Sequence, residues 1–70
     1  MTPQQIAKSV RFVRKKGGLT QLQLARLAGV GKTAVFDIEK SKETVQLDTL
    51  MKVLDTLNIR LILQTPFKQE

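Results

Sequence analysis

The side chains of this 70-residue chain that could act chemically are mainly cations, and they gather near its start. Residues 1–16 carry five basic side chains and no acidic one, whereas residues 17–70 carry seven basic and six acidic side chains. The five are Lys8, Arg11, Arg14, Lys15 and Lys16. A basic helix of this kind can bind polyanions, either the phosphate backbone of a nucleic acid or an anionic membrane surface. The alternative is a lysine-rich face that meets only solvent.

Catalytic chemistry is poorly supported by the composition. The chain has no histidine and no cysteine, which excludes a His-containing triad, a thiol nucleophile and a Cys/His metal site. Residues 29–33 resemble the end of a phosphate-binding P-loop, but Arg26 stands where the full motif needs glycine, and a helix is expected where it needs a strand. We therefore expect no enzymatic activity, no cofactor and no metal. The absence of cysteine fits a reducing compartment, and we expect a cytoplasmic protein.

The elements that must position these cations are helices within one small domain. Thr20 and Gln23 have the spacing of a capping box, and Thr2 with Gln5 repeats it. Glycines 17, 18 and 29, with Asn58, are typical helix stops. Apolar residues recur at helical spacing between these signals, with Leu47 on the inward face of the last helix. The pattern predicts helices over about residues 3–16, 21–28, 31–40 and 47–57.

Three residues in the middle of the chain have the spacing of a tight bend between two helices. Ala25 is small enough to allow a close approach, Gly29 can adopt the positive φ that the turn needs, and Val35 can fill the angle between the helices. This spacing is typical of a helix-turn-helix, which places its second helix in the major groove of DNA.

The segment from residue 19 to residue 59 resembles the Xre/Cro-type helix-turn-helix family. The matching residues are Leu19-Thr20-Gln21, Leu24-Ala25, Gly29-Val30, Val35, Ile38-Glu39 and Leu47-Asp48-Thr49-Leu50. Within that family, the short chain, the EKSKET loop and the C-terminal apolar segment are similar to the HipB-type antitoxins, which are dimeric repressors. The implied fold is mainly α, a lambda-repressor-like domain of four or five helices.

Helix-turn-helix geometry assigns roles to individual side chains. Lys32 and Thr33 begin the second helix of the motif and are expected to contact base edges, Lys32 at guanine O6/N7. Phe36, one turn later, either meets a thymine methyl group or packs partly into the core. Asp37 either caps a helix, pairs with a nearby cation or accepts a hydrogen bond from cytosine. Phosphate contacts are expected from Gln21, Arg11, Arg14, Lys15, Lys40 and Lys42.

The family resemblance also exposes departures. Phe36 and Asp37 replace the small or amide side chains that are common at these positions. Leu22 and Leu27 occupy positions that are often charged, and they are either ordinary exposed leucines or part of a patch that binds a partner.

Near the end of the chain, the spacing of apolar residues changes from helical to alternating. Ile59, Leu61 and Leu63 share one face of an alternating segment, and Ile62 lies on the other. A lone strand leaves its backbone groups unpaired, so we expect this strand to pair with its copy in a homodimer; an extra helical turn is the alternative. The expected organisation is a DNA-binding domain (1–58), a dimerisation strand (59–65) and a tail (66–70).

The function expected from these observations is sequence-specific transcriptional repression at an inverted-repeat operator in double-stranded DNA. The resemblance implies an antitoxin that regulates its own operon and binds a HipA-like kinase toxin. The alternatives are a stand-alone Xre-family regulator, a basic amphipathic module on a membrane surface, and a protein-interaction module. Only Phe12 supplies a bulky aromatic on the face that a membrane would require, so we expect no membrane partner.

Overall fold

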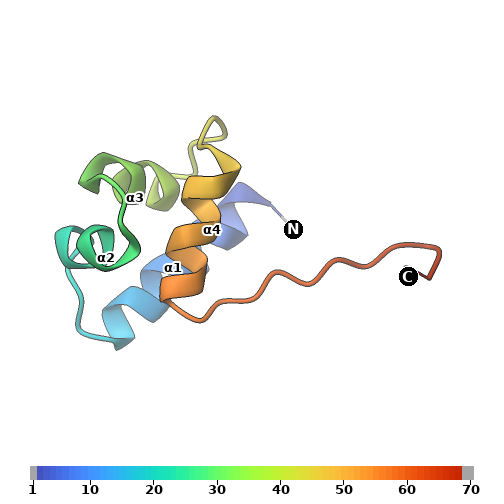
Figure 1. Cartoon of the computed structure of the whole chain (residues 1–70), viewed down its shortest axis with the longest axis horizontal. Helices are drawn as coiled ribbons and strands as arrows, with labels where there is room; N and C mark the ends of the chain where they lie inside the picture. Colours follow the sequence, from blue (N-terminus) through green and yellow to red (C-terminus); the bar gives the residue numbers. More distant parts are fainter. Residues whose placement is uncertain (1, 69–70) are drawn as a thin grey trace.

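The computed structural model describes residues 2–68, in which four α-helices pack into one layered bundle (Figure 1). The helices are α1 (Pro3–Lys16), α2 (Gln21–Ala28), α3 (Lys32–Glu39) and α4 (Leu47–Thr56). α2 and α3 are consecutive and lie against each other, while α1 and α4 cover the remaining sides of the core. The predicted four-helix, helix-turn-helix architecture is confirmed. None of the helices within residues 2–68 is long and apolar enough to cross a membrane.

The helix starts are determined by the two predicted capping boxes. The Thr20 hydroxyl accepts a hydrogen bond from the backbone N–H of Gln23 at 3.1 Å, and the Gln23 side chain accepts one from the Thr20 N–H at 2.8 Å. Thr2 and Gln5 form the same reciprocal pair, with Pro3 at the first helical position of α1. Each box satisfies two N–H groups that the helix itself leaves without a partner.

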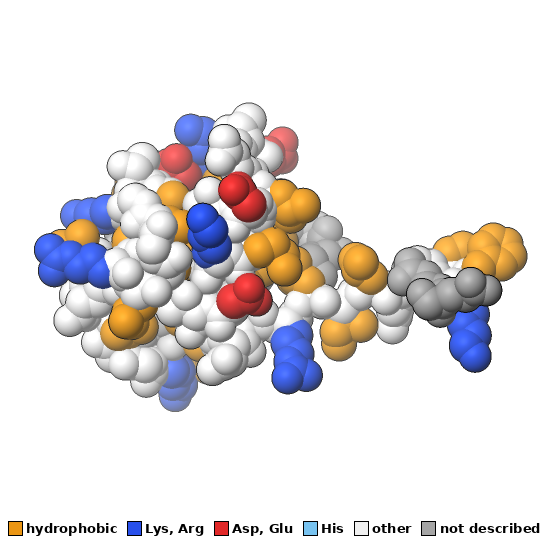
Figure 2. All heavy atoms as spheres, in the orientation of Figure 1, with side chains coloured by type: hydrophobic (Ala, Val, Ile, Leu, Met, Phe, Trp, Pro, Cys, Tyr) orange, Lys and Arg blue, Asp and Glu red, His pale blue; other side chains and the backbone are white. Residues whose placement is uncertain are grey.

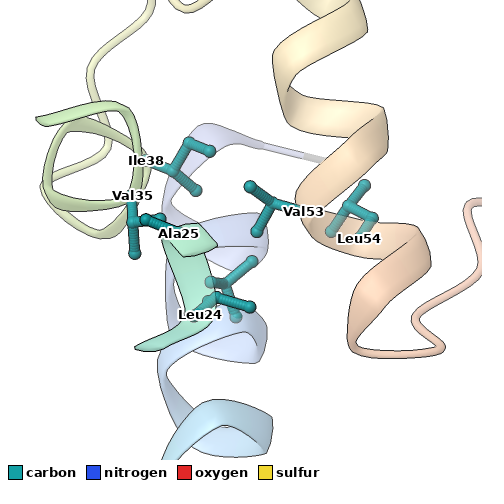
Figure 3. Close-up of a cluster of buried hydrophobic side chains, with 7 residues drawn as sticks. Leu24, Ala25, Val35, Ile38, Val53 and Leu54 are labelled. Atoms are coloured by element: carbon teal, nitrogen blue, oxygen red, sulfur yellow. The ribbon is translucent and has the colours of Figure 1, made fainter. Parts of the chain in front are cut away.

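The core is a cluster of aliphatic side chains contributed by all four helices. Leu24 and Ala25 come from α2, Val35 and Ile38 from α3, and Val53 and Leu54 from α4 (Figure 3). Val10 adds the contribution of α1 and is fully buried. Val35, predicted to fill the angle between two helices, lies in this cluster, but one prediction for the core is wrong. Leu47 was expected on the inward face of α4 but is 70% exposed, because it begins the helix beyond the edge of this cluster.

The bend between α2 and α3 follows the predicted geometry. Gly29 ends α2 in the left-handed region with φ of 72°, a conformation that costs glycine little because it has no Cβ. Ala25 is 1% exposed and its carbonyl accepts from the N–H of Val30 at 3.0 Å, so the chain turns directly beside the end of α2. Val35 is fully buried in the cluster that joins the two helices.

The predicted C-terminal strand is absent from the single chain. Residues 59–65 form no strand within the part of the chain that the structure describes. Ile59 and Leu61 still pack against the core, and the chain beyond them runs away from the four helices (Figure 1). The physical reason is that a strand is defined by a hydrogen-bonded neighbour, and no other extended segment among residues 2–68 lies beside it. An extra helical turn does not form there either. The predicted tail, 66–70, is described only as far as residue 68.

Candidate nucleic-acid interface

The start of α3 projects from the body while the rest of the helix is anchored. Lys32 and Thr33 are exposed, whereas Val35 and Ile38 on the opposite face are buried at 0% and 4% exposure. The N-cap residue of α3 is Gly31, which offers no side chain to cap the first turn. The predicted base-contacting end of α3 is therefore open to solvent.

Four of the predicted DNA-contacting residues line one shallow hollow. Gln21 at the start of α2 lies with Lys32, Thr33 and Phe36 of α3 around a space of about 330 Å³. The turn at Gly29 brings these two helix starts to the same side of the molecule. The hollow combines an ammonium group, an amide, a hydroxyl with its methyl group, and an aromatic ring, which are side chains suited to base edges and phosphates.

Phe36 belongs to this surface rather than to the core. Its side chain is 45% exposed and is absent from the cluster of core residues. The Lys40 Nζ lies 4.9 Å from the centroid of the Phe36 ring, within the range of a cation–π contact. The alternative that Phe36 packs into the core is therefore not what the structure shows.

Asp37, for which the sequence left three roles open, pairs with a lysine. Its Oδ2 lies 3.5 Å from the Nζ of Lys42, with the two side chains 25% and 56% exposed. This ion pair offsets the repulsion between the Asp37 carboxylate and a phosphate backbone. It also engages the Lys42 ammonium that was expected to contact phosphate.

Arg14 is the clearest departure from the predicted interface. It is a buried residue, and its guanidinium donates from Nε and Nη2 to the Glu39 carboxylate at 2.6 and 2.9 Å, and from Nη1 to the Leu19 carbonyl at 2.8 Å. All three nitrogens are thus engaged within the protein. The phosphate contact expected of Arg14 is contradicted by this placement, because the side chain links α1, the following turn and the end of α3.

Glu39 is the acidic partner in this link, and its side chain is 5% exposed. Burial raises the pKa of the Glu39 carboxyl, but the hydrogen bonds from Arg14 and Gln21, with the charges of Arg14 and Arg11, outweigh it and hold that pKa below its ordinary value. The Gln21 Nε2 donates to Glu39 Oε1 at 3.3 Å. Glu39 therefore connects the buried ion pair to a residue that lines the hollow.

A signal for this pair was present in the sequence. Ala7, Val10 and Arg14 have the i, i+3, i+7 spacing of one helix face, so Arg14 shares the buried side of α1. The other basic residues predicted to bind phosphate from α1, Arg11 and Lys15, are exposed.

The residues predicted for dimerisation divide into two pairs. Ile59 and Leu61 are half-buried against the core, whereas Ile62 and Leu63 are 74% and 82% exposed. Phe67, further along, is 81% exposed. Figure 2 shows apolar side chains spaced along this extended segment, outside the body.

Comparison with protein families decides how the fold is classified. A family model described as "Helix-turn-helix" matches residues 10–63, which is most of the chain and includes the bend and the hollow. The chain belongs to the Xre/Cro helix-turn-helix family. It is therefore a DNA-binding transcriptional regulator of a family that is not enzymatic.

Two named bacterial proteins resemble the chain over most of its length. The uncharacterized HTH-type transcriptional regulator y4mF of Sinorhizobium fredii is 40% identical over 65 residues, covering 93% of this chain and 86% of that protein. Antitoxin HipB of Escherichia coli K12 is 29% identical over 62 residues, covering 89% of this chain and 70% of that protein.

A solved structure described as a HipA–HipB–O2–O3 complex contains a chain of the same shape. It superposes with a TM-score of 0.82 at 27% identity and covers 96% of this chain and 94% of that one. The similarity therefore extends through the helical body and most of the C-terminal segment.

Proposed function

We propose that this chain is a dimeric transcriptional repressor that binds an inverted-repeat operator in double-stranded DNA. The observation that carries the proposal is the open start of α3, where Lys32 and Thr33 project beside Gln21 and Phe36. In this proposal Lys32, Thr33 and Phe36 contact bases, with Asp37 held at the edge of the contact by Lys42. Gln21, Arg11, Lys15, Lys40 and Lys42 lie against phosphates. The proposed place of action is the cytoplasm.

The C-terminal segment completes the proposed dimer. Residues 59–65 are extended and carry two exposed aliphatic side chains, Ile62 and Leu63. Pairing with the same segment of a second copy satisfies the open backbone groups and buries these side chains. In a twofold dimer the two α3 helices would then bind DNA half-sites about 34 Å apart.

The DNA-binding part of the proposal is tested by gel shift at two salt concentrations, with the region upstream of the chain's own gene as probe and a scrambled duplex as competitor. Lys32→Ala is expected to weaken specific binding by about ten- to a hundredfold. Arg11→Ala is expected to reduce the salt slope by about two units for all sequences, one for each copy in the dimer. Lys52→Ala, an exposed lysine of α4 outside the predicted contacts, serves as the control. Equal binding of probe and scrambled duplex contradicts sequence-specific repression.

The dimer is tested separately by sedimentation. The full chain is expected to sediment as a dimer, and Leu63→Lys as a monomer, because the substitution places a charge in the proposed interface. A full chain that stays monomeric at the concentrations used for gel shift contradicts the proposed pairing.

We further propose that the regulator is an antitoxin that represses its own operon and binds a HipA-like kinase toxin. Support comes from the 27% identity and matching shape of the chain in the HipA–HipB–O2–O3 complex. The test is co-purification of the tagged chain with a kinase-like protein encoded beside it, and relief of that kinase's toxicity on co-expression. Absence of both contradicts the antitoxin role and leaves DNA binding untouched.

A stand-alone regulator without a toxin is the second candidate function. Its support is the 40% identity to y4mF, which is described as an HTH-type transcriptional regulator and not as an antitoxin; this identity is higher than that to HipB. A gene neighbourhood without a kinase, combined with a specific gel shift, supports this candidate over the antitoxin.

A further inference from the structure

Phe36 places an exposed aromatic ring on the surface that faces DNA in the proposed function. The inward face of α3 is already filled by Val35 and Ile38, so the ring is not needed to close the core. Lys40 lies over the ring, with its Nζ 4.9 Å from the centroid. The ring is therefore held at the surface, and the side of it that borders the hollow is available to a ligand.

The side chains that line the hollow beside the ring are suited to bind a small apolar group attached to a nucleobase. Its lining residues, Gln21, Lys32, Thr33 and Phe36, include no carboxylate. Thr33 supplies a methyl group and Phe36 an aromatic surface, while Lys32 and Gln21 supply hydrogen-bond donors. In the major groove the apolar feature of the standard bases is the C5-methyl group of thymine. A methyl group at C5 of cytosine occupies the equivalent place.

We propose that this hollow binds the C5-methyl group of a pyrimidine, so that the protein recognises thymine and 5-methylcytosine alike and disfavours uracil and unmodified cytosine at that position. The proposal rests on the DNA-binding function proposed above. Lys32, one turn before Phe36 and lining the same hollow, is placed to donate to a guanine O6/N7 at a neighbouring base pair. Methylation of cytosine at that position thus becomes a way to regulate operator binding.

The test uses duplexes that the full chain itself selects from a random library, so the binding site is found by the experiment. Each thymine of the selected site is replaced in turn by deoxyuridine, which removes only the methyl group. We expect one thymine per half-site at which uracil weakens binding about fourfold, the effect of burying one methyl group, and about fifteenfold when both half-sites are changed. At the same position a 5-methylcytosine·guanine pair is expected to bind about fourfold more tightly than cytosine·guanine.

Two phenylalanine variants locate the effect. Phe36→Ala is expected to bind thymine and uracil duplexes equally. Phe12→Ala is the matched control, because Phe12 is 62% exposed and has Lys16 Nζ 5.6 Å from its ring centroid, yet lies on α1 and does not line the hollow. It is expected to retain the full uracil effect. Circular dichroism of both variants verifies that the helices are intact.

The outcomes separate this proposal from the one on which it rests. Selected duplexes that bind tightly but show no uracil effect at any thymine overturn methyl recognition while DNA binding stands. A uracil effect that persists in Phe36→Ala assigns the methyl contact to another residue and likewise overturns the proposal. A library that yields no enriched duplex overturns the proposed sequence-specific function itself.

Discussion

The helical body (residues 2–58) and the outer part of the C-terminal segment (residues 62–68) bury their aliphatic side chains to very different extents. In the body, Leu24 and Val53 are fully buried by neighbours within the same copy. In the segment, Ile62 and Leu63 lie mostly in solvent. The contrast teaches that one copy of the chain is sufficient to close the core, whereas the exposed apolar residues of the segment gain a partner only from outside that copy.

Breaking the link between α1 and α3 is expected to have the largest effect on the body. Arg14→Ala leaves the Glu39 carboxylate buried without its counter-charge, and we expect the free energy of unfolding to fall by about 3 to 5 kcal/mol. Lys42→Ala, which breaks the more exposed pair with Asp37, is the control and is expected to cost less than about 1 kcal/mol. Urea unfolding followed by circular dichroism measures both, and similar losses for the two variants contradict the assignment.

A pair of leucine variants tests the comparison itself. Leu24→Ala creates a cavity in the core and is expected to lower the free energy of unfolding by about 2 to 5 kcal/mol. Leu63→Ala is expected to change it by less than about 0.5 kcal/mol at concentrations that keep the chain monomeric. A large loss of unfolding free energy for Leu63→Ala in the monomer would mean that Leu63 packs against the body, and it would contradict the comparison between the two regions.

The boundary between the two regions is sharpened at Ile59. This residue is half-buried, and its N–H donates to the Leu54 carbonyl at 2.9 Å, so it is still attached to the last turn of α4. We expect Ile59→Ala to cost about 1 to 2 kcal/mol in thermal or urea unfolding. This is less than the value for Leu24→Ala and more than that for Ile62→Ala, which we expect to be below about 0.5 kcal/mol because Ile62 is 74% exposed. Equal effects at residues 59 and 62 place the boundary elsewhere.

The smallest effect is a pH dependence confined to the body. Because the pKa of Glu39 is lower in the folded chain than in the unfolded chain, its contribution to stability is full above the unfolded pKa and is lost as pH falls through the folded one. Urea unfolding between neutral and acidic pH measures this slope. We expect it to be shallower in Glu39→Gln, whose side chain does not titrate, and an unchanged slope contradicts the role of Glu39.

Local rules in the sequence were enough to predict the body. The capping boxes at Thr2 and Thr20 and the left-handed turn at Gly29 depend on neighbours within a few residues, and all three are confirmed. The role of Arg14 was misjudged because its partner Glu39 lies 25 residues away, so Arg14 was interpreted as a surface charge on its own helix. The positive φ of Ser41, 64°, was also not predicted, because serine rarely adopts the left-handed backbone conformation.

The candidate nucleic-acid interface was predicted only in part, because local rules place some of its residues and not others. Lys32, Thr33 and Phe36 follow from one helix and one turn, and the structure brings them together with Gln21. The pairing of Asp37 with Lys42 depends on how the chain continues after α3, which the motif does not specify. The strand expected at residues 59–65 depends on a second molecule, so it lies beyond what a single chain can form.

The two residues of the Arg14–Glu39 pair cannot exchange positions. Because the same guanidinium also donates to the Leu19 carbonyl, exchanging the two residues would set a carboxylate against that carbonyl, two acceptors facing each other without a proton between them. A charge-swapped double mutant therefore does not restore what either single mutant loses, and the arginine is required on the first helix and the acid on the third.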